Sequence, residues 1–497
     1  MKYLKKLLEN KKLLFLLVFL YGSVITIFLY YPSYVLDGYC QLAKSYSAYA
    51  ENFFIAGRFL TAFIWIFFDI IKIPHDVLSV LTQILSITFL SLSVVKIYTT
   101  VKPKIADNVL YKLTLLLGST LIIFNPFTEG ILIFEEAFCM SLSVYISILA
   151  AIKIGTEINK RNFIVSLIMM ICANFLYQGS ICYFIPIVIL VNILNNQKLS
   201  ILDYIKENYK KIIIYALVFG ISCIIEFISL QLYVNLTGAL HNKVGNIDFI
   251  KNLFIIRDHI RLTNERMQSV IHAQIFRYSY TVLALLILSR ILVTFKKDYK
   301  YIFYIGLVAS LTVLAPFVPN LVMKTDLNYT SSRLLLSFGA LIGFLIVGST
   351  LLHEKREKKI NNYYLLLVLI IGSYFFVKCS CSLFYNTYKD FKRYKSDIEY
   401  LEIYKDKVKN YEKDNNIKVK TIYYDIKHLD RPNYPGVFYN FNNVRVSACT
   451  WGLECALQAY IDKDLKVKEM KDKKANVMLE QKTDISYEKD KIYIIFR

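Results

Sequence analysis

The sequence predicts an all-α polytopic membrane protein with about eleven transmembrane helices, further helices at the outer membrane surface, and a small C-terminal α/β domain. The chain has 497 residues, of which 56% are hydrophobic, and its mean hydropathy is +0.43. Apolar runs of roughly 17 to 25 residues recur along it, and each is long enough to cross about 30 Å of hydrocarbon. Because these runs are continuous rather than alternating, we expect helices and not barrel strands in the membrane.

The charge pattern sets the expected orientation of the chain. Its formal net charge is +21, which on a soluble domain would suggest nucleic-acid binding. Here the lysines cluster in short loops between apolar runs, as is typical of cytoplasmic loops, so we expect a lipid bilayer and no nucleic acid among the partners. The N-terminal stretch MKYLKKLLENKK precedes an apolar span without a small-residue cleavage site, which predicts an uncleaved first helix and a cytoplasmic N-terminus.

Two apolar stretches follow the first span, and only one of them is expected to cross the membrane. The first span covers 12–31 and runs outward, whereas the next basic loop, 96–112, should be cytoplasmic. The stretch 59–73 is short and contains an aspartate, so we interpret it as a helix lying on the outer surface. The second span is then 77–95.

The later spans alternate with the basic loops and predict a multi-pass protein of the cell membrane with an extracytoplasmic C-terminal domain. We expect these spans at 110–124, 137–153, two within 162–195, 212–235, one ending at 295, one ending near 323, one ending before 353, and 362–378. The long loop 236–277 is basic although it is assigned to the outside, and long loops obey the charge rule poorly.

The C-terminal part of the chain differs in composition from the rest. We divide the chain into a transmembrane domain, 1–380, and an extracytoplasmic domain, 381–497. Apolar residues at helical spacing begin the second domain, and the segments 418–426 and 491–496 read as strands. Cys449 and Cys455 lie six residues apart, and on an extracellular face they either pair or stay free and buried.

The candidate catalytic groups are acidic residues expected on the outer side. The sequence contains no phosphate-cradling glycine loop and neither an HExxH nor a GxSxG motif. Asp37 follows the first span, where it is either a base or an ordinary loop carboxylate. Glu129, Glu135 and Glu136 lie in the segment NPFTEGILIFEEAF. Two adjacent carboxylates at the start of an apolar helix are costly unless they face water or a partner. Negative charge at a helix N-terminus is also favourable with the helix macrodipole.

Arginines at the outer ends of apolar helices are the candidate phosphate ligands. Arg58 and Arg333 occupy such positions. The planar guanidinium can bond two phosphate oxygens, but an arginine at this depth can also be an interfacial anchor. Gln178 follows Tyr177 at an outer turn and is a candidate substrate ligand.

The order of these segments resembles the bacterial Gtr-type (type II) glucosyltransferases of the GT-C class. The resemblance covers roughly 15–350 and rests on an aspartate in the first outer loop, a Gly-Arg before an apolar run, the outer NPFTEGILIFEEAFCMSLS, and the Tyr-Gln of NFLYQGS. It implies a GT-C-like fold and a polyprenyl-phosphate sugar donor. The matching positions are Asp37, Arg58, Glu135 or Glu136, and Gln178. The chain departs from the pattern at Gly38, where a second acid is frequent.

These observations predict an integral membrane glycosyltransferase that moves a hexose, expected to be glucose, from a polyprenyl-phosphate sugar to a cell-envelope glycan. Asp37 would accept the acceptor proton, with Glu135 and Glu136 as the second acidic set, and the arginines would bind the leaving phosphate. We expect no organic cofactor, and the sequence leaves a metal requirement open. A lipid-linked glycan flippase or transporter would need charges at mid-membrane depth. A glycan polymerase or ligase would be favoured by the basic segment 257–277.

Overall fold

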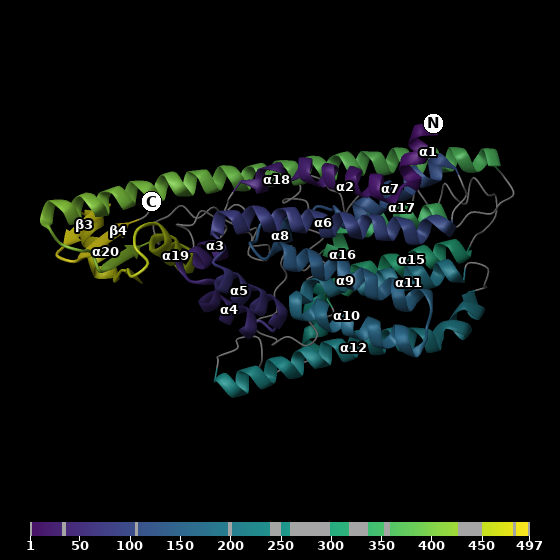
Figure 1. Ribbon diagram of the computed structural model, residues 1–497, viewed down its shortest axis with the longest axis horizontal. Coiled ribbons are helices and arrows are strands. Elements are labelled where there is room, and N and C mark those ends of the chain that lie inside the picture. The colour runs from purple at the N-terminus through teal and green to yellow at the C-terminus, as the bar shows by residue number, and fades with distance from the viewer. Residues whose placement is uncertain are drawn as a thin grey trace.

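The helices of the chain lie side by side in an elongated bundle. The computed structural model describes residues 2–31, 36–104, 108–196, 201–238, 250–258, 299–317, 336–351, 358–425, 450–480 and 484–495. Within these ranges most residues are helical, as predicted. In Figure 1 the bundle helices run along the longest axis, and the N-terminus and the C-terminus lie toward opposite ends of that axis.

The bundle contains helices of very different lengths. Those of 11 or more residues are α2 (Lys11–Ile25), α5 (Phe59–Ile71), α6 (His75–Val101), α7 (Val109–Ile123), α9 (Ala137–Thr156), α10 (Lys160–Leu176), α11 (Phe184–Asn195), α12 (Ile201–Thr237), α15 (Tyr299–Leu314), α17 (Leu341–Leu351) and α18 (Lys358–Asn415). The shorter ones are α1 (Lys2–Glu9), η1 (Ile27–Tyr30), α3 (Leu36–Ala43), α4 (Tyr46–Ile55), η2 (Lys102–Lys104), α8 (Glu129–Leu132), η3 (Gln178–Tyr183) and α16 (Leu336–Gly339).

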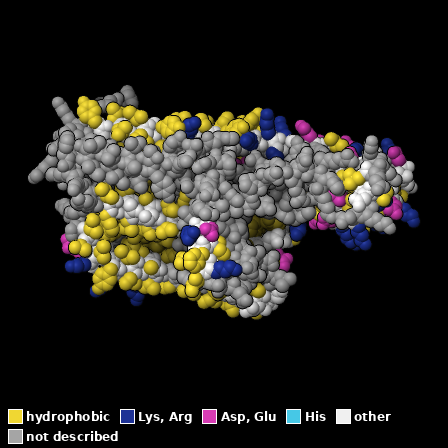
Figure 2. Space-filling view, turned by 180° about the vertical axis from the view of Figure 1, so that it is seen from behind, with side chains coloured by type: hydrophobic (Ala, Val, Ile, Leu, Met, Phe, Trp, Pro, Cys, Tyr) yellow, Lys and Arg dark blue, Asp and Glu magenta, His cyan; other side chains and the backbone are white. Residues whose placement is uncertain are grey.

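Several of these helices are suited to a membrane. Among the described residues, five helical segments are long and apolar enough to cross a bilayer, namely His75–Val101, Ala137–Thr156, Gln178–Asn195, Ile201–Thr237 and Asn362–Asn415. Figure 2 shows hydrophobic side chains spread over the bundle and charged ones gathered at its projecting end. The total of eleven spans stays a prediction, because the expected eighth span and part of the ninth lie outside the described residues.

The expected surface helix 59–73 corresponds to α5. It has 13 residues, which at 1.5 Å per residue extend about 20 Å and fall short of the hydrocarbon thickness. The buried side chains recur at helical spacing on one face, and the helix ends at Lys72, whose φ of 52° is left-handed. The length of α5 therefore agrees with a helix that does not cross, and its position at the surface stays a prediction.

Helix α18 connects the bundle to the C-terminal part of the chain. It is continuous over 58 residues, about 87 Å at the usual rise, so the expected domain boundary at 380 falls inside a helix. In Figure 1 it runs along the bundle and extends beyond it, and a small sheet lies at its far end. The division into two domains remains a prediction.

The C-terminal α/β segment, which we define as the described residues of 421–495, contains a four-stranded sheet. Its elements are β1 (Thr421–Asp425), α19 (Thr450–Tyr460), β2 (Lys466–Glu469), α20 (Asp472–Glu480), β3 (Ile485–Glu488) and β4 (Lys491–Ile495). The strand order is β2-β1-β4-β3, with β1 parallel to both of its neighbours and β3 antiparallel to β4. The strands expected within 418–426 and 491–496 are β1 and β4.

The disulfide of this segment differs from the expected pair. Cys455 of α19 bonds to Cys40 of α3, with the two Cα atoms 4.7 Å apart. The possible pairing of Cys455 with Cys449 is therefore wrong, and Cys449 lies outside the described residues. The reason is tertiary packing, because α19 lies against α3, which is 415 residues away in sequence.

Candidate active site

Arg58 is positioned by a turn that requires a glycine. Gly57 has a φ of +75°, in the left-handed region, and a Cβ there would lie 2.5 Å from Glu226 Oε1 and 3.1 Å from Gln178 Nε2. Arg58 follows as the N-cap of α5. The Gly-Arg pair seen in the sequence thus combines a tight backbone approach with a cation at the start of a helix.

The guanidinium of Arg58 lies between a carboxylate and an aromatic ring. Arg58 Nη1 is 3.4 Å from Glu136 Oε1, and the guanidinium carbon is 4.7 Å from the centre of the Tyr177 ring. The Arg58 side chain is 11% exposed, and its Nε has no hydrogen-bond partner among the described residues. One donor of the guanidinium fork is therefore buried without a hydrogen-bond acceptor among the described residues.

Glu136 belongs to a buried chain of hydrogen bonds. Its Oε2 accepts from Gln41 Nε2 at 3.4 Å, and Gln41 Oε1 accepts from Trp65 Nε1 at 3.1 Å. The Glu136 side chain is 4% exposed. Together with Arg58, these contacts bring three elements, α3, α5 and the turn before α9, to one carboxylate.

Glu135 is the least satisfied carboxyl of the site. It is 5% exposed, and neither of its oxygens has a hydrogen-bond partner within the described part of the chain. Burial, and then the adjacent charge of Glu136, raise the pKa of the Glu135 carboxyl well above its usual range. Burial and, next, the charge of Glu135 raise the pKa of Tyr46 on α4. A buried carboxyl with a raised pKa is a candidate for a role in proton transfer.

Gln178 joins the same region from η3. Its Nε2 donates to the carbonyl of Ala56 at 2.9 Å and to Glu226 Oε1 at 3.1 Å. These bonds tie the turn before Arg58 to α12. The structure thus brings together the Gly-Arg and Tyr-Gln motifs, which are 120 residues apart in the chain.

Glu129 belongs to a second polar cluster, on α18. Asn386 Nδ2 donates to Glu129 Oε2 at 2.5 Å. About two turns further along α18, Arg393 contacts Asp390 at 3.2 Å and Asp397 at 4.0 Å. Glu129 therefore links the segment between α7 and α9 to α18.

Two predicted site residues lie partly or wholly outside the residues that the structure describes. Asp37 lies in the backbone of α3, one turn before Gln41, and its side chain is outside the described residues. Arg333 also lies outside them. Their roles remain predictions.

Sequence reasoning missed Gln41, Trp65 and Glu226. Glu226 had a usable signal, since a carboxylate within an apolar span marks a functional or paired position. Gln41 had none, because one glutamine in a polar loop is unremarkable until the fold buries it.

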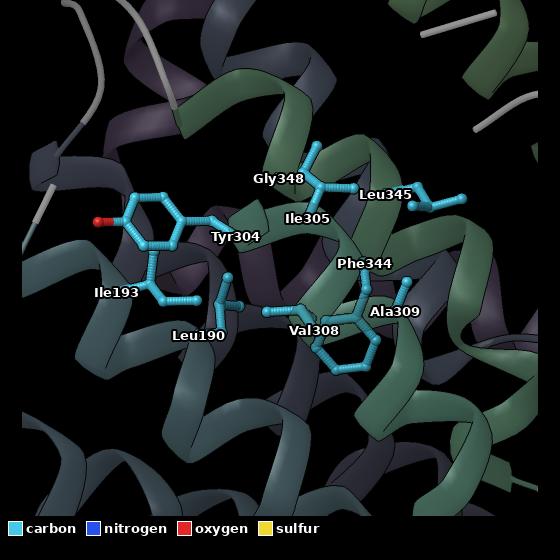
Figure 3. Close-up of a pocket in the computed structure, with 9 residues that line it drawn as sticks. All are labelled: Leu190, Ile193, Tyr304, Ile305, Val308, Ala309, Phe344, Leu345 and Gly348. Carbon is cyan, nitrogen blue, oxygen red and sulfur yellow. The ribbon is translucent and has the colours of Figure 1, made fainter. Parts of the chain in front are cut away.

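The apolar cavity in Figure 3 is a different feature. It lies between α11, α15 and α17, and the labelled side chains that line it carry no charge. Its volume of about 20 Å³ has room for roughly one water molecule and not for a sugar. Across the described ranges, no cluster of three His, Cys, Asp or Glu side chains is arranged to hold a metal ion.

One comparison with known proteins finds a match, and it covers this region. A family model described as "Glucosyl transferase GtrII" matches residues 44–350, which is more than half of the chain. The matched range includes Arg58, Glu135, Glu136 and Gln178, and it leaves out α3, α18 and the C-terminal α/β segment. A search of curated proteins returned no match.

Proposed function

Because this chain belongs to the GtrII family of glucosyl transferases, we propose that it is a membrane hexosyltransferase that takes glucose from a polyprenyl-phosphate donor. The proposed acceptor is a glycan of the cell envelope. The apolar helices suit an enzyme whose donor is held in a bilayer. The family match favours a transferase over a flippase.

The observation that carries the proposal is the buried pair of carboxyls beside one arginine. Transfer of glucose breaks the bond between the anomeric carbon and the donor phosphate and forms a bond to an acceptor hydroxyl. The departing phosphate needs a cation, and the hydroxyl needs a group that accepts its proton. Arg58 supplies the cation, and Glu135, which precedes the Arg58 partner Glu136 in the sequence, supplies a carboxyl that can exchange a proton with the base.

Arg58 is the proposed ligand of the donor phosphate. Its contacts with Glu136 and Tyr177 hold the guanidinium in place before a donor arrives, while its Nε remains available. A preorganised cation costs little rearrangement when charge develops on the leaving group. Arg333 is the proposed second phosphate ligand, on its sequence position alone.

Asp37 is the proposed catalytic base, and Glu135 is its proposed partner in proton transfer. The position of Asp37 one turn before Gln41 supports this, because Gln41 bonds Glu136 and so brings α3 to the carboxyls. The raised pKa of Glu135 suits it to take on the proton that Asp37 accepts. Glu136 would act mainly by holding Arg58, and Gln178 by holding the turn that carries Arg58 while it contacts the substrate.

We propose that this site faces the extracytoplasmic side. The disulfide joins α3 to α19, and disulfides persist in oxidising compartments. The two chain ends lie toward opposite ends of the bundle, which agrees with a cytoplasmic N-terminus and an extracytoplasmic C-terminal domain (Figure 1).

Donor selection by the reconstituted protein tests this proposal. Liposomes containing the protein and an envelope glycan would be given polyprenyl-phosphate glucose, polyprenyl-phosphate mannose or a nucleotide-activated glucose, each radiolabelled. We expect transfer from the first donor only, with Arg58→Ala as the inactive reference. Comparable transfer from the nucleotide sugar would contradict the proposed donor class.

A further inference from the structure

We propose that the C-terminal α/β segment positions the active site, because the Cys40–Cys455 disulfide holds α3 where Gln41 can fix Glu136. Cys40, Cys455 and Gln41 are then positioning residues for the reaction, and this role rests on the proposed function. Helix α3 is the connecting part, since it is attached to the C-terminal segment on one side and to the candidate site on the other.

The attachment to the C-terminal segment is both covalent and apolar. Tyr39 and Leu42 of α3 pack into a core built from α18, α19 and the sheet, whose buried members include Leu401, Leu453 and Ile492. Tyr39 also meets the ring of Tyr460 edge-on, with the ring centres 6.1 Å apart. The disulfide lies between these contacts, and Figure 1 shows α3 next to α19.

The attachment of α3 to the site uses both the nitrogen and the oxygen of the Gln41 side-chain amide. Gln41 is 1% exposed, and it donates to Glu136 while it accepts from the indole of Trp65. Trp65 is fully buried on α5 and packs against the rings of Phe53, Phe68 and Phe138. Because these rings hold the indole in place, it cannot easily move together with α3. A displacement of α3 would therefore break the bond to Trp65, the bond to Glu136, or both.

Helix α3 depends on its partners for its position. It has eight residues, whereas isolated helices shorter than about 12 residues are marginal in water. The disulfide fixes α3 one residue before Gln41. Opening it would therefore loosen the residue that holds Glu136, and through Glu136 the guanidinium of Arg58.

Both halves of this connection lie outside the segment that matches the family model. The match begins at 44, after α3, and ends at 350, before α18. In this proposal the C-terminal segment supports the part of the chain that matches the family model.

Tryptophan fluorescence tests the connection without any substrate. The chain has two tryptophans, Trp65 and Trp451, so a full-length Trp451→Phe protein reports on Trp65 alone. We expect a phosphine reductant to shift the Trp65 emission in this protein, because its partner Gln41 moves. The same treatment should cause no shift when Cys40 and Cys455 are both serine. An unchanged emission, with thiol labelling showing that Cys40 and Cys455 are free, would overturn the proposal.

Kinetics test whether the disulfide acts through Gln41. The Cys40→Ser/Cys455→Ser protein and the Gln41→Ala protein should each transfer about 10- to 100-fold more slowly, the effect of a displacement of about 1 Å in a positioned group. The triple variant should be no slower than Gln41→Ala, since two changes that act through one contact do not add. Cys381→Ser, at an exposed free cysteine of α18, is the matched control and should transfer at the normal rate.

Additive losses in the triple variant would overturn the role of Gln41. If the unaltered protein transfers no glucose from a polyprenyl phosphate, the proposed function fails, but the fluorescence shift still decides whether the C-terminal segment controls the position of α3.

Discussion

The two adjacent glutamates before α9 should differ in how the same substitution changes the stability of the protein. Glu135→Gln and Glu136→Gln each remove one negative charge and preserve the shape of the side chain. Glu135 has no hydrogen-bond partner among the described residues, whereas Glu136 bonds Arg58 and Gln41. We expect the first change to slow transfer with little effect on stability, and the second to lower stability and also to slow transfer, because Glu136 holds Arg58.

The magnitudes follow from these contacts. Glu136→Gln leaves the Arg58 cation, 11% exposed, without its anionic partner, and breaking a buried ion pair in this way costs about 3 kcal/mol. Glu135→Gln breaks no described bond, so the free energy of unfolding should change by less than about 1 kcal/mol at acidic pH. Its transfer rate should nevertheless fall by about 10²-fold, because an amide cannot accept the proton.

The pH dependence of stability separates the two glutamates further. The pKa of Glu135 is raised in the folded protein, so the folded state binds more protons than the unfolded state above the unfolded pKa of about 4.3. The unaltered protein should therefore lose stability as pH rises toward the raised pKa. Glu135→Gln removes this loss, and the variant should become relatively more stable with increasing pH.

Thermal unfolding of the purified variants in detergent between pH 5 and pH 8, paired with transfer assays, measures both effects. The reasoning would be refuted if Glu135→Gln lowered the melting temperature as much as Glu136→Gln. It would equally be refuted if Glu135→Gln left the transfer rate unchanged.

Other predictions follow from the same geometry. Asp37→Asn should slow transfer by about 10²-fold with little change in protein level. Near-normal transfer would indicate that Glu135, and not Asp37, is the base. Arg58→Lys should weaken donor affinity because an ammonium cannot form the two-oxygen fork, and Arg58→Ala should weaken it more; unaltered donor affinity would mark an interfacial anchor. Gly57→Ala should destabilise the protein by about 1–3 kcal/mol, because an alanine is strained at this positive φ. The control Gly220→Ala has open space around it and should cause no loss of stability. Equal melting temperatures of the two variants would argue against the strained turn. Cysteine labelling should find position 102 cytoplasmic and position 37 outside; labelling of position 102 from outside would require α5 to cross.

Helices with strong local signals were predictable from the sequence. The expected span 77–95 lies within α6, and the expected surface helix 59–73 coincides with α5. Both signals are properties of a short stretch, namely a continuous apolar run and its length. Strands β2 and β3 were missed because their four-residue segments are mostly polar and are ordered by their neighbours.

The features that the sequence analysis missed or predicted wrongly depend on contacts between segments that are distant in the sequence. The partner of Cys455 lies 415 residues away, so no spacing rule could identify it. Gln41 becomes part of the site only because α3 is fixed against α19 and α5. By contrast, Arg58 and Glu136 were both predicted as site residues, since a charge at the end of an apolar helix is visible in the sequence.

Glucose transfer in membranes tests the central claim most directly. Membranes with the unaltered protein, with Asp37→Asn, and without the protein would receive polyprenyl-phosphate glucose carrying a radiolabel. Label should enter the envelope glycan with the unaltered protein, about 10²-fold more slowly with Asp37→Asn, and not at all without the protein. Equal labelling in all three membranes would contradict the account.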